Sequence, residues 1–217
     1  MIGILTYPIP HQKTQDIVLR LLKHFEPTEI CLIRAKYGIR PKRDVLINHR
    51  PDNPLPYNDA QFADVIGSIF FKNIADAPKC DFYIIGGCGI ISDIGDKLIL
   101  NSHPGYLPNV RGLDALKWAL YEGQPIGITV HAISDKVDLG EVYHRAIIKR
   151  EPFEDFYHLA MRQYKLEIDA LIHVAAYFSD YQKRATNIDA YDREYPVHKR
   201  MDIRTEAELL MKMRREW

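Results

Sequence analysis

Short apolar runs, separated by longer amphipathic segments, recur along this 217-residue chain. Four runs in the first half are too short for helices and end at turn-forming or polar residues, which is typical of buried strands. These predicted strands cover residues 2–7, 30–36, 81–87 and 98–101. Two later runs, at 126–133 and 141–148, are joined by a short loop, so we expect them to pair with each other.

The segments between the strands have the apolar spacing of helices. One stripe lies between positions 17 and 25, with Thr14 as its expected N-cap. Another helix is expected to begin after Asn58 and to continue through Ile69 and Phe70, and further helices are expected at about 113–121, 153–178 and 205–215. This alternation predicts an α/β protein with a doubly wound, mostly parallel, Rossmann-like sheet.

The composition becomes strongly polar after Tyr181. We therefore expect residues 1–180 to form one α/β domain, a size that suits a single core. Residues 181–217 are too few to bury a core of their own. We expect them to form a short C-terminal extension that packs on the domain or at a homodimer interface.

Charge and cysteine content narrow the functional classes. The 29 basic residues are balanced by 29 acidic ones, whereas proteins that bind nucleic acid usually carry a basic surplus. The three cysteines include no Cys-x-x-Cys pair, so neither a disulfide framework nor a zinc knuckle is expected. The chain lacks an apolar run long enough to cross a membrane. These features predict a cytoplasmic protein without membrane insertion.

The stretch NSHPGYLPNVRG, residues 101–112, places polar side chains at the end of a predicted strand. Asn101 and His103 are two positions apart, so both side chains face the same side of an extended strand. Open α/β sheets place their chemistry at such strand ends. Taken alone, the pattern also fits a turn asparagine and a histidine that is hydrogen-bonded within the fold.

The stretch GITVHAISDKVDLG, residues 127–140, ends another predicted strand. His131 lies at the strand end and Asp138 lies in the following loop, just before Gly140. A carboxylate placed there can orient a histidine or share its proton in acid-base catalysis. An aspartate in an ordinary hairpin turn is the alternative.

Together these stretches resemble the folate-dependent formyltransferase family, and within it the sugar N-formyltransferase branch. The family pattern is Asn-x-His-Pro-x-x-Leu-Pro-x-x-Arg-Gly, followed by Gly-x-Thr-x-His with an Asp seven positions later. The matching residues are Asn101, His103, Pro104, Leu107, Pro108, Arg111, Gly112, Gly127, Thr129, His131, Asp138 and Gly140. The resemblance implies the formyltransferase fold and an enzyme that transfers a formyl group from 10-formyltetrahydrofolate to an amine without a metal.

The resemblance also implies roles for individual residues. Asn101 would donate a hydrogen bond to the negative oxygen of the reacting formyl group, His103 would stabilise that oxygen and move protons, and Asp138 would hold the imidazole. His131 would either contact the folate or support the Asp138 loop. The folate contacts implied by the resemblance are Gly87, Cys88, Gly89, Ile90, Ile91, His131, Ile133 and Val137.

The acceptor is inferred from what each branch of the family carries. Members acting on glycinamide ribonucleotide have a glycine-rich loop after the first strand, where this chain reads YPIPHQKTQD. Members acting on initiator tRNA have a second, basic domain. The remaining branch formylates nucleotide-linked amino sugars for surface polysaccharide such as O-antigen, and basic side chains would bind its pyrophosphate. The expected substrate-binding residues are His11, Lys13, Arg40, Arg43, Arg50 and Arg111.

Two alternatives remain open at this point. One is phosphoribosylglycinamide formyltransferase activity in purine synthesis. The other is a catalytically silent formyltransferase-like domain used for binding, although such a domain would have no reason to keep Asn101, His103 and Asp138 together.

Overall fold

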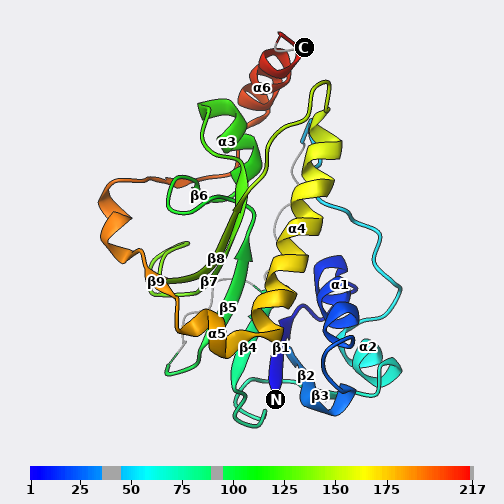
Figure 1. Cartoon of the computed structure of the whole chain (residues 1–217). Helices are drawn as coiled ribbons and strands as arrows, with labels where there is room; N and C mark the ends of the chain where they lie inside the picture. The colour runs from blue at the N-terminus through cyan, green and yellow to red at the C-terminus, as the bar shows by residue number, and fades with distance from the viewer. Residues whose placement is uncertain (36–44, 89–94, 216–217) are drawn as a thin grey trace. The chain divides into compact units, whose positions relative to one another are not determined.

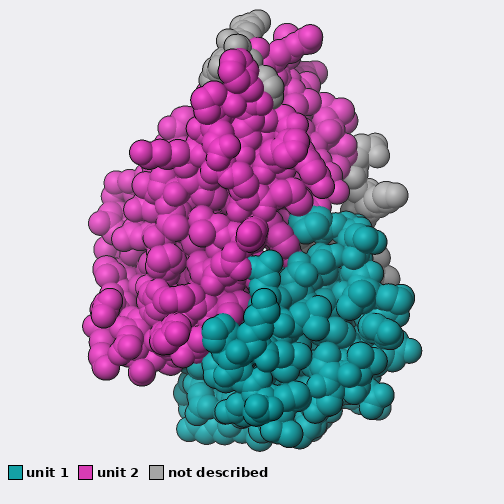
Figure 2. Space-filling model, turned by 45° about the vertical axis from the view of Figure 1, so that its right-hand side comes forward, with its two compact units in different colours: residues 1–40, 51–101 teal, residues 41–50, 102–217 magenta. Residues whose placement is uncertain are grey.

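A computed structural model of the protein describes residues 1–35, 45–88 and 95–215. The chain forms two compact units. Unit 1 comprises Met1–Arg40 and Pro51–Asn101, and unit 2 comprises Pro41–Arg50 and Ser102–Trp217 (Figure 2). Strand β5 (Ile99–His103) passes from unit 1 into unit 2 at residue 102. The division between the two units thus falls within this strand.

Unit 1 is a parallel sheet with strand order β3-β2-β1-β4-β5. Ile4, Leu32 and Ile84, from three neighbouring strands, are fully buried, as expected when helices cover a parallel sheet. The strands are β1 (Ile2–Thr6), β2 (Ile30–Arg34), β3 (Ile69–Phe71) and β4 (Phe82–Ile85), and the helices are α1 (Gln12–Leu21), the 3-10 turn η1 (Pro27–Glu29) and α2 (Asp59–Val65) (Figure 1).

Two expectations for unit 1 are wrong in detail. Helix α2 ends at Val65, because Gly67 adopts a left-handed φ of 73° that terminates the helix, and Ile69 then begins strand β3. The N-cap of α1 is His11, whose ring accepts the backbone N–H of Thr14. The Thr14 hydroxyl pairs instead with the Thr6 hydroxyl, 2.8 Å away.

Unit 2 contains an antiparallel ladder of β7, β8 and β9, so the expected pairing of the two later strands is confirmed. Helix α4 packs along β7 and β8 (Figure 1). The helix expected at 153–178 corresponds to α4, which is followed by the short α5. The strands are β6 (Arg111–Gly112), β7 (Gly127–Ala132), β8 (Glu141–Ile147), β9 (Thr186–Asn187) and β10 (Val197–His198), and the helices are α3 (Ala115–Glu122), α4 (Phe156–Ala176), α5 (Phe178–Gln182), the 3-10 turn η2 (Asp189–Arg193) and α6 (Ile203–Arg215).

The C-terminal extension packs within unit 2. Strand β10 pairs with β6 in a small second sheet, and α6 lies against α3 (Figure 1). Leu209 and Met213 of α6 join a buried apolar cluster with Leu116 of α3. Beneath it, the Lys117 ammonium donates to Glu206 in a fully buried ion pair. No helix in the described ranges is long and apolar enough to span a membrane.

Candidate active site

The end of β5 fixes the imidazole of His103. This side chain is only 3% exposed, and its Nε2 donates to the carbonyl of Val110 at 2.9 Å. The turn after the strand is held to β7 by Thr129, whose hydroxyl donates to the Gly105 carbonyl and accepts the Leu107 N–H. Because a carbonyl can only accept, Nε2 carries the proton in this arrangement and Nδ1 faces the other way.

Asp138 faces that second nitrogen from the loop between β7 and β8. Its Oδ2 lies 3.5 Å from His103 Nδ1 and accepts the backbone N–H of Gly112 at 2.6 Å. Its Oδ1 lies 4.0 Å from His131 Nε2. The expected proximity of His103 and Asp138 is therefore confirmed. The pair is buried but not sealed, because the Asp138 side chain remains 14% exposed.

His131 is locked into β7. Its Nδ1 donates to the carbonyls of Ala132 and Leu139, which bridges the strand to the far arm of the Asp138 loop. Complete burial lowers the pKa of His131 from its ordinary value, while Asp138 acts in the opposite direction. A neutral, buried, doubly engaged imidazole supports the loop, which favours the structural alternative considered from the sequence.

Asn101 is the last residue of unit 1. It lies in β5 two positions before His103, and its side chain is half-buried. Ser102, between them, points to the opposite side of the strand, where its hydroxyl donates to Glu167 at 3.1 Å. The alternation places Asn101 and His103 on one side of β5, as the sequence predicts.

The expected folate contacts are only partly within the described chain. Gly89, Ile90 and Ile91 lie outside the described residues. A side chain at Gly87 would meet Tyr7 and His11, so glycine is needed where α1 approaches the sheet. Burial raises the pKa of the Cys88 thiol to about 11.

Two further folate candidates flank the Asp138 loop in unit 2. Ile133 is half-buried, and Val137 is 54% exposed. An exposed apolar side chain one residue before the central carboxylate offers surface for an apolar ligand group. These positions stay predicted folate contacts.

The predicted substrate-binding cations have different surroundings. The Arg111 side chain is 1% exposed, and its guanidinium donates to the carbonyls of Val137, Asp192 and Tyr195 and to the Asp192 carboxylate. This engagement gives Arg111 a structural role, and its substrate contact stays a prediction. Arg50 is half-exposed and lies 3.7 Å from the Glu167 carboxylate.

The other predicted cations lie near α1 or outside the described chain. His11 caps α1 and Lys13, in its first turn, is largely buried. Arg40 and Arg43 lie outside the described residues.

Two buried polar residues on α4 escaped the sequence analysis. Gln163 donates to the carbonyls of Pro104 and Gly127, and Glu167 accepts from Ser102. They brace the strand that carries His103 from the side opposite the imidazole. The available signal was their spacing of four on the apolar face of a helix, which places both on the buried side.

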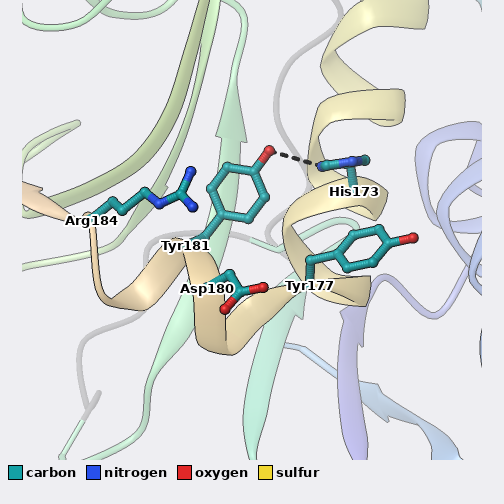
Figure 3. A pocket seen from close by; sticks show the side chains of 5 residues that line it. All are labelled: His173, Tyr177, Asp180, Tyr181 and Arg184. Atoms are coloured by element: carbon teal, nitrogen blue, oxygen red, sulfur yellow. Dashed lines mark hydrogen bonds between the residues drawn. The ribbon is translucent and has the colours of Figure 1, made fainter.

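A surface hollow of about 240 Å³ lies at the end of α4 and on α5 (Figure 3). Its Tyr181 hydroxyl bonds with His173 Nδ1 at 2.8 Å. The lining residues are His173, Tyr177, Asp180, Tyr181 and Arg184. His173, Tyr177 and Tyr181 are spaced four positions apart, which places them on one side of a helix. This spacing was the sequence signal for the hollow.

Metal coordination is not a feature of the described ranges. Within residues 1–35, 45–88 and 95–215, no group of three or more His, Cys, Asp or Glu side chains is arranged to hold a metal ion.

The sequence matches a known family over its central part. Residues 87–175 match the family model described as formyl transferase. The phosphoribosylglycinamide formyltransferase of Bacillus subtilis is 32% identical over 92 residues, which are 39% of this chain and 47% of that relative. The match thus spans about half the length of this relative.

Solved structures show the same fold along most of the chain. The N-formyltransferase of Helicobacter canadensis, solved with folinic acid and dTDP-3-aminofucose, has a TM-score of 0.66 at 16% identity, covering 93% of this chain and 71% of that one. The phosphoribosylglycinamide formyltransferase of Anaplasma phagocytophilum has a TM-score of 0.57 at 18% identity, covering 87% of this chain and 90% of that one. The chain therefore has the formyltransferase fold, and the segment that carries His103, His131 and Asp138 matches the formyl transferase family model.

Proposed function

We propose that this chain is an N-formyltransferase that uses 10-formyltetrahydrofolate to formylate the amine of a nucleotide-linked amino sugar. One observation carries the proposal: a buried imidazole at the end of β5 faces a carboxylate 3.5 Å away, within the segment that matches the formyl transferase family. Acid-base groups must lie within hydrogen-bond reach of each other or of one bridging water.

The geometry assigns a distinct task to each member of the pair. With Nε2 of His103 donating to Val110, a proton gained at Nδ1 is stabilised by the Asp138 carboxylate. The N–H of Gly112 fixes the orientation of that carboxylate. Asp138 thus supports an imidazolium that forms transiently, and the Asn101 amide, on the same side of β5, would donate to the formyl oxygen as negative charge develops there.

The described surroundings are compatible with a folate donor. When bound, 10-formyltetrahydrofolate supplies the formyl carbon that the amine attacks. Val137 and Ile133 offer apolar surface beside Asp138, and Tyr7 donates to the Cys88 carbonyl and so orders the start of the other expected folate segment. The structure of the Helicobacter canadensis enzyme contains folinic acid, a folate, which supports the same cofactor class here.

The amino-sugar acceptor rests on the same comparison and on the β1–α1 connection. The Helicobacter canadensis structure contains a dTDP-linked amino sugar, and further structures of this fold are described as sugar N-formyltransferases. In this chain the connection contains Pro8 and Pro10 and no glycine, and the His11 ring caps α1. A helix start already capped by a side chain is less suited to hold a ribose phosphate than a glycine-rich loop.

Glycinamide ribonucleotide remains the second candidate acceptor, because the Bacillus subtilis relative carries that activity in its name. An acceptor panel separates the two. Purified protein is incubated with 10-formyltetrahydrofolate and either dTDP- and UDP-linked amino sugars or glycinamide ribonucleotide, while release of tetrahydrofolate is followed. Turnover with an amino-sugar nucleotide supports the proposal, and exclusive turnover with glycinamide ribonucleotide refutes the acceptor. Failure with every amine, together with no folate binding, favours a silent binding domain.

A further inference from the structure

Asp138 has a backbone conformation that is uncommon for a residue other than glycine. Its φ is 51°, in the left-handed region, which aspartate enters more readily than most side chains but still occupies less often than the right-handed regions. Such conformations persist when the surrounding structure holds them in place. The loop around Asp138 must therefore be held by other parts of the chain.

Asp189, in the C-terminal extension, holds the far side of the loop. Its carboxylate accepts the N–H of Gly140 at 2.9 Å, and the N–H of its neighbour Ile188 donates to the Gly140 carbonyl at 3.0 Å. The backbone N–H and C=O of Gly140, two positions after Asp138, therefore both form hydrogen bonds with the extension. Because Gly140 itself has a φ of 101°, few other residues could occupy this position.

Arg111 holds the near side of the loop. Its Nε and Nη2 donate to the carbonyl of Val137, the residue immediately before Asp138, at 3.0 and 2.8 Å. The remaining contacts of the guanidinium go to the extension: Nη2 donates to the Asp192 carboxylate at 3.0 Å, and Nη1 to the Tyr195 carbonyl at 2.9 Å. The extension thereby anchors the guanidinium that fixes Val137.

The extension also holds the donor to the Asp138 carboxylate. The N–H of Gly112 makes that bond, and Gly112 pairs with His198 of β10. A Cβ on Gly112 would lie 2.2 Å from the His198 carbonyl oxygen, which shows how closely the two backbones approach. The N–H of Leu113 donates to the same carbonyl at 3.0 Å.

We propose that residues 188–198 of the extension are a positioning element for Asp138, with Asp189 as its principal side chain. The segment contacts Gly140 directly, holds Val137 through the Arg111 guanidinium, and pairs with Gly112, the backbone donor that orients the Asp138 carboxylate. Asp189 is a positioning residue, since it contacts the loop and not the His103–Asp138 pair. The catalytic consequence rests on the formyltransferase function proposed above, whereas the structural consequence does not.

The test compares three variants of the full-length chain. Asp189→Ala removes the acceptor for Gly140, and Asp189→Asn keeps one carbonyl oxygen there. Asp202→Ala is the matched control, because Asp202 lies in the same extension and its carboxylate accepts the N–H groups of Arg204 and Thr205 at the start of α6. Two quantities are measured: the Gly112 amide proton resonance by NMR, and kcat and KM for formyl transfer.

We expect Asp189→Ala to move the Gly112 amide resonance upfield, because the short bond to Asp138 weakens. We expect kcat to fall about tenfold, as for the loss of one well-placed hydrogen bond, with KM for the acceptor within about twofold. Asp189→Asn should restore most of kcat, and Asp202→Ala should resemble the wild type in both measurements. A merely stabilising role of Asp189 would lower the melting temperature and leave the Gly112 resonance and kcat of the folded protein unchanged, which would overturn the proposal.

The two measurements separate this inference from the proposed function. If the wild type formylates no amine, the function is refuted, but the Gly112 resonance still decides whether Asp189 positions the loop. Should Asp189→Ala not fold, Asp192→Ala takes its place, because it removes the half-exposed carboxylate that anchors Arg111. An unchanged Gly112 resonance in that variant overturns the inference in the same way.

Discussion

The buried ion pair between Lys117 and Glu206 should make a large contribution to the stability of unit 2, in which it joins α3 to α6 of the C-terminal extension. Both side chains are 1% exposed, the Lys117 Nζ donates to Glu206 at 2.5 Å, and the other Glu206 oxygen accepts the Leu46 N–H at 2.7 Å. Removing one partner of such a pair leaves an uncompensated buried charge and typically costs about 3–5 kcal/mol. We therefore expect Glu206→Ala to reduce the free energy of unfolding by about that amount.

Replacing both partners should be less harmful, because an apolar pair of similar volume needs no ionic partner and only the Leu46 N–H loses its acceptor. The assay is urea unfolding of the wild type, Glu206→Ala and the double variant Lys117→Met with Glu206→Leu. For a chain of this size, the same cost corresponds to a melting temperature of Glu206→Ala that is roughly 6–20 °C lower than that of the wild type. Glu208→Ala is the control, because exposed Glu208 lies on the same helix and accepts a hydrogen bond from the Tyr121 hydroxyl. A Glu206→Ala cost below about 1 kcal/mol, similar to that of Glu208→Ala, would refute the reasoning.

Three further predictions follow from the geometry of unit 2. Asp138→Asn should lower kcat about 10²–10⁴-fold with nearly unchanged folate affinity, measured by steady-state kinetics and folate titration; activity within threefold of wild type would contradict the role of Asp138. Arg50→Ala should raise KM for the sugar nucleotide about tenfold if Arg50 contacts its diphosphate, whereas a fall in kcat alone would show that Arg50 only braces Glu167. Burial, assisted by the nearby cations Arg50 and Lys117, lowers the pKa of His49 to about 4, so the protein should lose about 3 kcal/mol of stability as the pH falls from about 6.5 to about 4. Urea unfolding of His49→Gln should show a weaker pH dependence over that window, and an identical dependence in both proteins would exclude this assignment.

Local patterns were sufficient to predict most of the sheet and the centre of the site. Fully buried apolar runs mark parallel strands, and the short loop between the last two runs predicted their pairing. The proximity of His103 and Asp138 was expected because the two stretches that carry them resemble the formyltransferase family and follow strand ends. For the strands, the information lies within a few residues of the feature that it predicts.

Nonlocal contacts, together with unusual local backbone and capping features, explain what the sequence did not reveal. The Arg111 guanidinium donates to the carbonyls of Asp192 and Tyr195, which lie about eighty positions away in the sequence. Because the sequence does not show such distant acceptors, Arg111 was interpreted as a substrate contact. Helix α2 was expected to continue into β3, because apolar spacing alone does not report the left-handed turn at Gly67. His11 as a cap of α1 was missed for a similar reason, since histidine is not a preferred N-cap residue.

The most direct test of the central claim is the rate of tetrahydrofolate release by wild type and His103→Ala, with 10-formyltetrahydrofolate and a dTDP- or UDP-linked amino sugar both saturating. The account predicts measurable turnover by the wild type, accompanied by a formylated sugar nucleotide in the mass spectrum. It also predicts a loss of at least about 10²-fold in His103→Ala, the usual size of an acid-base contribution. Equal rates in the two proteins, with both correctly folded, would contradict the claim that the His103–Asp138 pair carries the chemistry.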